Sequence, residues 1–243
     1  MISLKRVQDE RLYGGKAASL GKLLRARMRV QPGIALGWNE SLYTSSELLK
    51  ALCDTLGSVK VVVQSKWAVR SSAIGEDSTE HSFAGQHDTV LNVECWGLDQ
   101  AVSKVRESLY NKRSKIYRKN RRIEDAPKMG VVIQRMVPNV KISAVVFTCD
   151  PVAQSDDVVI EYTSGLGDRL VSGQVSPDQV IVKRGYETAL IDEGHKSLCR
   201  LYDIALEIER LYNCPVDIEA AYNNDEWWLC QARPITTLKE SIL

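Results

Sequence analysis

Apolar and polar residues alternate in two short segments near the end of the chain, at positions 216–221 and 227–235. Alternation with a period of two is typical of strands that bury one face. The residues between them, 222–226, are Tyr, Asn, Asn, Asp and Glu, a composition that favours a turn. The pattern therefore predicts a β-hairpin.

The polar residues of this hairpin suggest a binding face. Asp217 and Glu219 should share one face of the first strand, and Gln231 and Arg233 should share one face of the second. If the register brings these faces together, two carboxylates, an amide oxygen and a guanidinium converge. Such oxygens suit Mg²⁺, and an adjacent arginine suits a phosphate that bridges to the ion. The alternative is a hairpin with a solvated polar face.

A glycine pair precedes a helical pattern near the start of the chain. Gly14 and Gly15 break the preceding segment, and apolar residues within 17–24 then follow helical spacing. Lys16 thus stands where a glycine-rich loop opens a helix, and backbone N–H groups there could bind a phosphate together with its ammonium. The P-loop pattern is absent, and a surface lysine after a turn is the alternative interpretation.

A second candidate phosphate-binding segment begins with Arg70, Ser71 and Ser72. These residues follow a strand-like segment at 67–69 and lead into a stretch of small residues that ends at Gln86. The arginine supplies a fork of donors, the hydroxyls supply more, and glycines allow the backbone to come close to a phosphate. The alternative is a flexible surface loop.

The rest of the pattern predicts a mixed α+β chain with antiparallel strands. We find no internal repeat and no low-complexity linker. Helical and strand-like spacing predicts helices at 42–56, 99–122 and 196–212, and strands at 59–63, 89–93, 131–138, 143–148 and 158–162.

Overall composition narrows the class of protein. The formal net charge is +1 over 243 residues, so composition gives no reason to expect a nucleic acid, a membrane surface or an acidic substrate. No apolar run approaches membrane-spanning length, and the first residues lack a signal-peptide core. The six cysteines show no CxxC spacing. This spacing argues against a zinc site and a disulfide framework, and it predicts a cytoplasmic location.

One stretch departs from this charge balance. Residues 104–122 contain nine lysines and arginines and a single glutamate, Glu107. A stripe that binds nucleic acid is one interpretation, and a solvated helix face is the other. The near-neutral total charge favours the solvated face, so we expect no nucleic-acid partner.

A series of short motifs covers nearly the whole chain: GGKAASLG at 14–21, AVRSSA at 68–73, SFAGQ at 82–86, QRMV at 134–137, FTCDP at 147–151, GLG at 165–167, SPD at 176–178, DIE at 217–219 and QARPIT at 231–236. In this order, the motifs resemble the N-terminal nucleotide-binding domain of the pyruvate phosphate dikinase and phosphoenolpyruvate synthase family. Rifampin phosphotransferase and the plant glucan, water dikinases are relatives of that family. Each motif is weakly specific by itself, and their number and order carry the resemblance.

The resemblance implies an ATP-grasp fold, in which two α+β subdomains with mixed or antiparallel sheets close on ATP. The subdomains would be residues 1–128 and 129–243. The resemblance also implies that ATP phosphates are contacted by Lys16, Arg70, Ser71 and Ser72.

The resemblance assigns further roles in the second half of the chain. The hinge strand beside adenine would be Gln134, Arg135, Met136 and Val137. Glu219 and Gln231 would hold Mg²⁺, with Asp217 close to the nucleotide and Arg233 reaching a terminal phosphate. In phosphoryl transfer the protein mainly neutralises and aligns charge, so the catalytic residues would be Lys16, Arg70 and Arg233.

The resemblance leaves the phosphoryl acceptor open. Members of the family pass the phosphoryl group to a histidine in a Thr-Ser-His motif on a mobile domain, and this sequence has no such motif. A module that works with a separate phosphohistidine protein, or a kinase that acts directly on a small molecule, would fit. A non-catalytic ATP-binding sensor or regulatory subunit is the alternative. The ending after Thr236 fits either a natural split protein or an excised domain.

Overall fold

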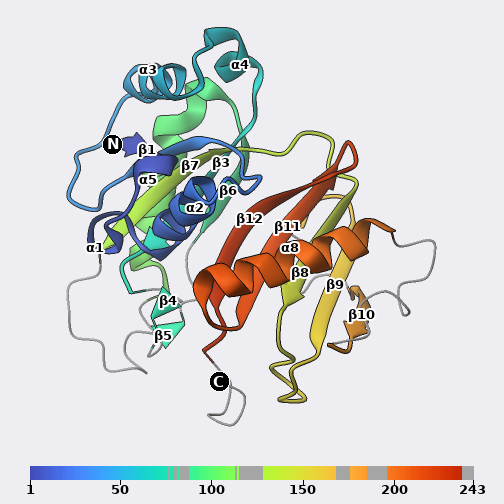
Figure 1. Cartoon of the computed structure of the whole chain (residues 1–243). Helices are drawn as coiled ribbons and strands as arrows, with labels where there is room; N and C mark the ends of the chain where they lie inside the picture. The colour runs from blue at the N-terminus through green and yellow to red at the C-terminus, as the bar shows by residue number, and fades with distance from the viewer. Residues whose placement is uncertain are drawn as a thin grey trace. The chain divides into compact units, whose positions relative to one another are not determined.

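A computed structural model describes residues 1–75, 77–78, 81–82, 88–112, 114, 128–167, 176–184 and 196–236. The chain forms two compact units, Met1–Met136 and Val137–Leu243 (Figure 1). The boundary expected from the sequence follows Lys128, whereas the first unit extends to Met136 because the strand at 129–135 lies within its sheet. Both units combine helices with antiparallel strands, so the expected α+β class is confirmed.

A five-stranded antiparallel sheet forms the centre of the first unit. In spatial order its strands are β1 (Ile2–Ser3), β2 (Gly33–Leu36), β7 (Met129–Arg135), β3 (Trp67–Ala73) and β6 (Thr89–Val93). A separate ribbon pairs β4 (Asp77–Ser78) with β5 (His81–Ser82). The strand expected at 67–69 therefore continues to Ala73, so the Arg-Ser-Ser motif lies inside β3.

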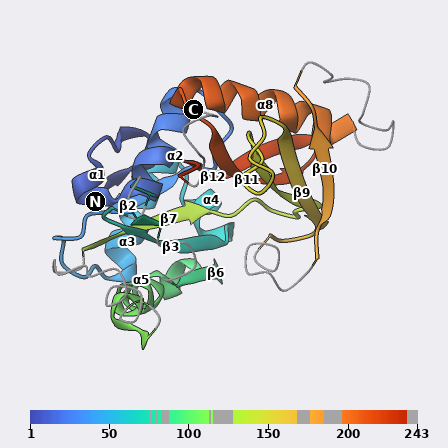
Figure 2. The ribbon, with the colours of Figure 1, turned by 90° about the horizontal axis from the view of Figure 1, so that it is seen from below.

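Helices cover both faces of this sheet. Figure 2 shows α1 and α2 on one side of the strands and α3 and α5 on the other. Trp67 on β3 is fully buried in the core, and its indole N–H donates to the Val62 carbonyl at 3.3 Å. The helices are α1 (Glu10–Tyr13), α2 (Gly15–Arg25), α3 (Ser45–Leu56), α4 (Val59–Gln64) and α5 (Leu98–Glu107), with 3₁₀ turns η1 (Leu4–Arg6), η2 (Cys95–Gly97) and η3 (Ser108–Tyr110).

The strand predicted at 59–63 is wrong, because these residues belong to helix α4. Gly57, with φ 71°, ends the preceding helix, and the Ser58 hydroxyl then accepts the Val61 N–H at 3.3 Å as the N-cap of α4. Val62 is fully buried in the core. The cap and this burial outweigh the strand propensity of the valine run.

The single long helix predicted at 99–122 is also wrong, because α5 ends at Glu107. The Ser108 hydroxyl donates to the Val105 carbonyl at 2.6 Å, and a 3₁₀ turn follows. Such local side-chain bonds compete with the helical hydrogen-bond pattern. Six of the nine basic residues of 104–122 lie at 113 and 115–122, outside the described residues.

In its described residues, the second unit is a five-stranded antiparallel sheet covered by a long helix. In spatial order the strands are β10 (Asp178–Val182), β9 (Val158–Ser164), β8 (Ile142–Phe147), β11 (Val216–Asn223) and β12 (Glu226–Pro234). Helix α8 (Lys196–Tyr212) lies across one face of this sheet (Figures 1 and 2). The helix expected at 196–212 and the closing hairpin are confirmed. Within the described part of the chain, no helix is long and apolar enough to cross a membrane.

Candidate functional site

The glycine pair fixes the beginning of α2 against strand β3. Gly14 has φ 84°, and a Cβ atom there would lie 2.0 Å from the Ser72 carbonyl oxygen. The close approach and the positive φ both require glycine. The Ala17 N–H donates to the Ser72 hydroxyl at 3.1 Å, so Ser72 satisfies one of the N–H groups that a helix leaves unpaired at its start. Lys16 projects from this anchored first turn.

Strand β3 separates the residues of the Arg-Ser-Ser motif. Because side chains alternate along a strand, Arg70 lies on the same face as Ser72, which contacts α2. Ser71 lies on the opposite face with Trp67 and is 2% exposed. The structure therefore brings Arg70 to the side of the sheet that carries Lys16. A helix start flanked by two cations suits a phosphate, while Ser71 points to the core face.

The hinge residues expected beside adenine are bonded within the first unit. The Gln134 side chain is buried, and its amide donates to the Gln31 carbonyl at 3.1 Å. The N–H groups of Arg135 and Met136 donate to carbonyls on adjacent segments at 3.0 and 2.9 Å. Val137 begins the second unit. These bonds make Gln134 a packing residue of the sheet, and its contact with adenine stays a prediction.

The closing hairpin has the register that brings its polar residues together. Asp217 pairs with Arg233, and Glu219 pairs with Gln231, so all four side chains lie on one face. The turn is shorter than the sequence suggested: Asn224 and Asp225 both have positive φ, at 49° and 61°. Two such residues are typical of a type I′ turn, which matches the twist of paired strands.

This register depends on a bulge in β12. On the turn side of the bulge Ala220 pairs with Leu229, whereas on the other side Glu219 pairs with Gln231, so Cys230 is an extra residue. If Cys230 instead paired regularly with Glu219, the same turn would place Gln231 opposite Ile218. Side chains alternate between faces, so Gln231 would then point towards α8.

The ion pair of the hairpin is partly buried. Arg233 Nε and Nη2 donate to Asp217 Oδ2 at 2.9 and 2.7 Å, with the two side chains 25% and 13% exposed. Burial raises the pKa of the Asp217 carboxyl, and the adjacent Arg233 guanidinium opposes this shift. Arg233 is thus oriented by Asp217, the residue expected near the nucleotide.

Glu219 and Gln231 suit a magnesium ion as partial ligands. Directly opposite residues in an antiparallel pair have Cβ atoms about 5 Å apart, so the carboxylate and the amide oxygen can approach one cation. Within the described residues, no group of three or more His, Cys, Asp or Glu is placed to hold a metal. Mg²⁺ usually takes one or two carboxylates, waters and substrate phosphates, so a partial protein set fits this ion.

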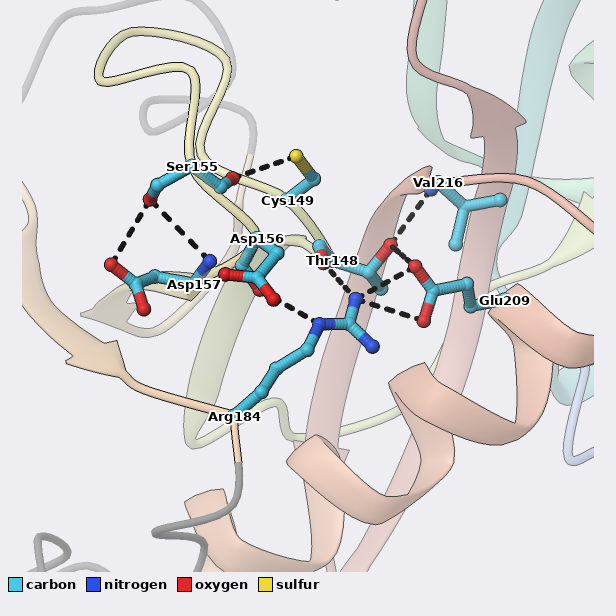
Figure 3. A network of polar contacts seen from close by, with 8 residues as sticks. All are labelled: Thr148, Cys149, Ser155, Asp156, Asp157, Arg184, Glu209 and Val216. Atoms are coloured by element: carbon cyan, nitrogen blue, oxygen red, sulfur yellow. Dashed lines mark hydrogen bonds and ion pairs between the residues drawn. The ribbon is translucent and has the colours of Figure 1, made fainter. Parts of the chain in front are cut away.

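A polar network at the beginning of β11 was not recognised from the sequence as a functional feature. It joins Thr148, Arg184, Glu209 and Val216 (Figure 3). The FTCDP motif at 147–151 was the available signal for Thr148, but nothing in the pattern links Arg184 to Glu209.

Comparison with protein families and known structures identifies proteins that are similar to this chain. The family model "Pyruvate phosphate dikinase, AMP/ATP-binding domain" matches residues 40–197 and 188–242. A probable phosphoenolpyruvate synthase from Methanocaldococcus jannaschii is 34% identical over 230 residues, covering 80% of this chain and 19% of the relative. Rifampicin phosphotransferase from Bacillus subtilis is 35% identical over 227 residues, covering 79% and 26%. D-Alanine–D-alanine ligase from Helicobacter pylori has a TM-score of 0.47 at 13% identity, covering 93% of this chain and 54% of the ligase.

The family match covers most of the chain, and the chain spans only part of each curated relative. It spans 19% of the synthase and 26% of the phosphotransferase. The matched residues include Arg70, the hinge segment and the whole hairpin, whereas Lys16 precedes them. The resemblance inferred from the ordered motifs is confirmed. The chain belongs to the family of the pyruvate phosphate dikinase AMP/ATP-binding domain.

Proposed function

We propose that this chain binds Mg·ATP and acts as a phosphotransferase module. It would pass a phosphoryl group to a histidine on a separate protein or to a small-molecule acceptor. The observation that carries the proposal is the hairpin register, which aligns Asp217, Glu219, Gln231 and Arg233 on one face. Membership of an AMP/ATP-binding family and relatives named as phosphoenolpyruvate synthase and rifampicin phosphotransferase support it.

The proposed roles follow from the charge of the transferring group. Mg²⁺ bound by Glu219 and Gln231 would neutralise phosphate oxygens. Arg233, oriented by Asp217, would stabilise charge on the terminal phosphate. In the first unit, Lys16 and Arg70 are the proposed phosphate-binding residues. Arginine suits this role because its planar donors match phosphate oxygens.

The identity of the acceptor is tested with ATP labelled separately at the β and γ positions. The protein is incubated with Mg²⁺ and each labelled ATP, with and without a candidate phosphohistidine protein. AMP formed only with the partner protein supports transfer to a histidine. ADP formed with a small acceptor supports a direct kinase.

Replacement of Glu219 with alanine tests the metal role. We expect turnover to fall by at least about a hundredfold with the fold intact, because the ion would lose its charged ligand. Glu207→Ala, which removes an exposed carboxylate from α8, is the control for general effects. Near-normal ATP consumption by Glu219→Ala under saturating Mg²⁺ would contradict the proposal.

The alternative is a non-catalytic ATP sensor or regulatory subunit. Such a protein needs to bind ATP but does not need every group that handles the transferring phosphate. The aligned hairpin face favours the phosphotransferase, because it keeps both the ligand pair and the oriented arginine. Tight ATP binding without turnover in the presence of any acceptor would favour the sensor.

A further inference from the structure

The beginning of β11, next to Asp217, is held by a buried threonine. Thr148 follows β8 and is 0% exposed. Its backbone N–H donates to the Val216 carbonyl at 3.0 Å, and its hydroxyl accepts the Val216 N–H at 2.9 Å. Val216 directly precedes Asp217, so these two bonds fix the backbone at the place where the Asp217–Arg233 pair begins.

The threonine hydroxyl is itself oriented by an ion pair (Figure 3). Thr148 Oγ1 donates to Glu209 Oε1 at 3.1 Å, so the hydroxyl uses both its donor and its acceptor capacity. Arg184 Nη2 contacts the two Glu209 carboxylate oxygens at 2.8 and 3.0 Å and also donates to the Thr148 carbonyl. Its Nε donates to the Asp156 carbonyl at 2.7 Å.

This network joins segments that are far apart in the sequence. Arg184 follows β10, Glu209 lies on α8, Thr148 follows β8, and Val216 begins β11. The Arg184 and Glu209 side chains are 33% and 17% exposed, so water screens this pair less than an open surface pair. Loss of one member would leave buried partners unsatisfied, which makes such networks sensitive to single changes.

We infer that Thr148, held by the Arg184–Glu209 ion pair, is a positioning residue for the Asp217–Arg233 end of the hairpin. This inference rests on the proposed function, because it assigns the network to the binding of Mg·ATP. In this inference the network acts indirectly, without contacting the ion or the nucleotide. It acts by fixing Val216, and through it the direction in which Asp217 meets Arg233.

The first arm of the test needs neither nucleotide nor metal. Amide hydrogen exchange of Val216 is measured in the wild type, Thr148→Val and Thr148→Ser. We expect the valine variant to exchange about tenfold faster, because the amide loses its acceptor, and the serine variant to stay within about threefold. Asn223→Ala is the matched control, since the Asn223 amide donates to the Pro138 carbonyl at the opposite end of β11.

The second arm measures the affinity for Mg·ATP. We expect Thr148→Val to raise the apparent dissociation constant for Mg·ATP about tenfold and Glu209→Gln to raise it about threefold, because Arg233 would be less well oriented towards the terminal phosphate. Thr148→Ser should restore near-normal values. Affinity for ADP, which lacks the terminal phosphate, should stay unchanged. Glu209→Gln keeps the side-chain volume, so it serves as the test if Thr148→Val does not fold.

The outcomes separate this inference from the proposed function. If the wild type binds no Mg·ATP, the proposed function fails, and the exchange arm still decides whether Thr148 controls Val216. If Val216 exchanges faster but the affinity for Mg·ATP is unchanged, the network is only structural and the inference is overturned. It is also overturned if Asn223→Ala weakens Mg·ATP binding as much as Thr148→Val does, because general loosening of β11 would then explain both.

Discussion

Replacing Ser72 with alanine would distinguish a structural role for this residue from a role in ATP contact. Its hydroxyl is 0% exposed and accepts the Ala17 N–H at the start of α2. The alanine variant leaves that buried N–H without its acceptor, which costs about 2 kcal/mol. For a unit of this size, that loss corresponds to a melting temperature lowered by about 7 °C.

Three measurements on the same sample check this expectation. They are the melting temperature without nucleotide, amide exchange of Ala17, and the dissociation constant for ATP. Ala17 should exchange at least about tenfold faster, and ATP affinity should fall by no more than about threefold. Ser65→Ala is the control, because the Ser65 hydroxyl donates to the Val61 carbonyl at 2.7 Å in the same unit. It should lower stability without changing Ala17 exchange.

One result would refute this assignment. If Ser72→Ala keeps the wild-type melting temperature and Ala17 exchange while ATP affinity falls more than about tenfold, the hydroxyl contacts the nucleotide directly. Equal acceleration of Ala17 exchange in Ser65→Ala would instead indicate general loosening of the unit.

Three further predictions concern other parts of the chain. Gly14→Ala should destabilise the first unit by more than about 3 kcal/mol in urea denaturation, because its Cβ would overlap a β3 carbonyl and its φ is positive. The backbone N–H and then the hydroxyl of Thr44 lower the pKa of Glu47. The pKa of Glu47 is therefore lower in the folded chain than in the unfolded chain. Its contribution to stability is present above about pH 4.3 and is lost as the pH falls through the folded pKa. The stability difference between the wild type and Glu47→Gln should therefore shrink in denaturation series run down to acid pH. Arg233→Met should lower stability by about 2 kcal/mol, because it strands the partly buried Asp217 carboxylate, and adding Asp217→Asn should recover part of this loss in a double-mutant cycle.

The sequence predicted the elements whose pattern is strong and local. The helix at 196–212 and the alternating strands of the second unit follow directly from their spacing. The valine run at 59–63 was wrongly predicted to be a strand. It forms a capped helix that buries only Val62, and this burial depends on tertiary packing that the local pattern does not show. The end of α5 likewise depends on the Ser108 hydroxyl, which spacing does not reveal.

The candidate site was predicted as a set of residues rather than as a geometry. Asp217, Glu219, Gln231 and Arg233 were identified by type and alternation, but their register was left conditional. A bulge depends on the length of paired strands, and no pattern of residue types specifies it here. The cap formed by Ser72 was missed for a related reason, since it joins segments far apart in the chain.

The extra residue at position 230 affects how this hairpin can vary. The bulged conformation at position 230, rather than the side chain of Cys230, sets the direction of the neighbouring side chains. Many substitutions of Cys230 should therefore preserve the polar face. A regular ladder that included Cys230 would turn Gln231 and Arg233 towards α8, whereas deletion of Cys230 would leave Gln231 opposite Glu219. Insertions in the Asn224–Asp225 turn would leave the polar half of the hairpin in register. This hairpin should therefore keep its polar face after either substitution or deletion of residue 230.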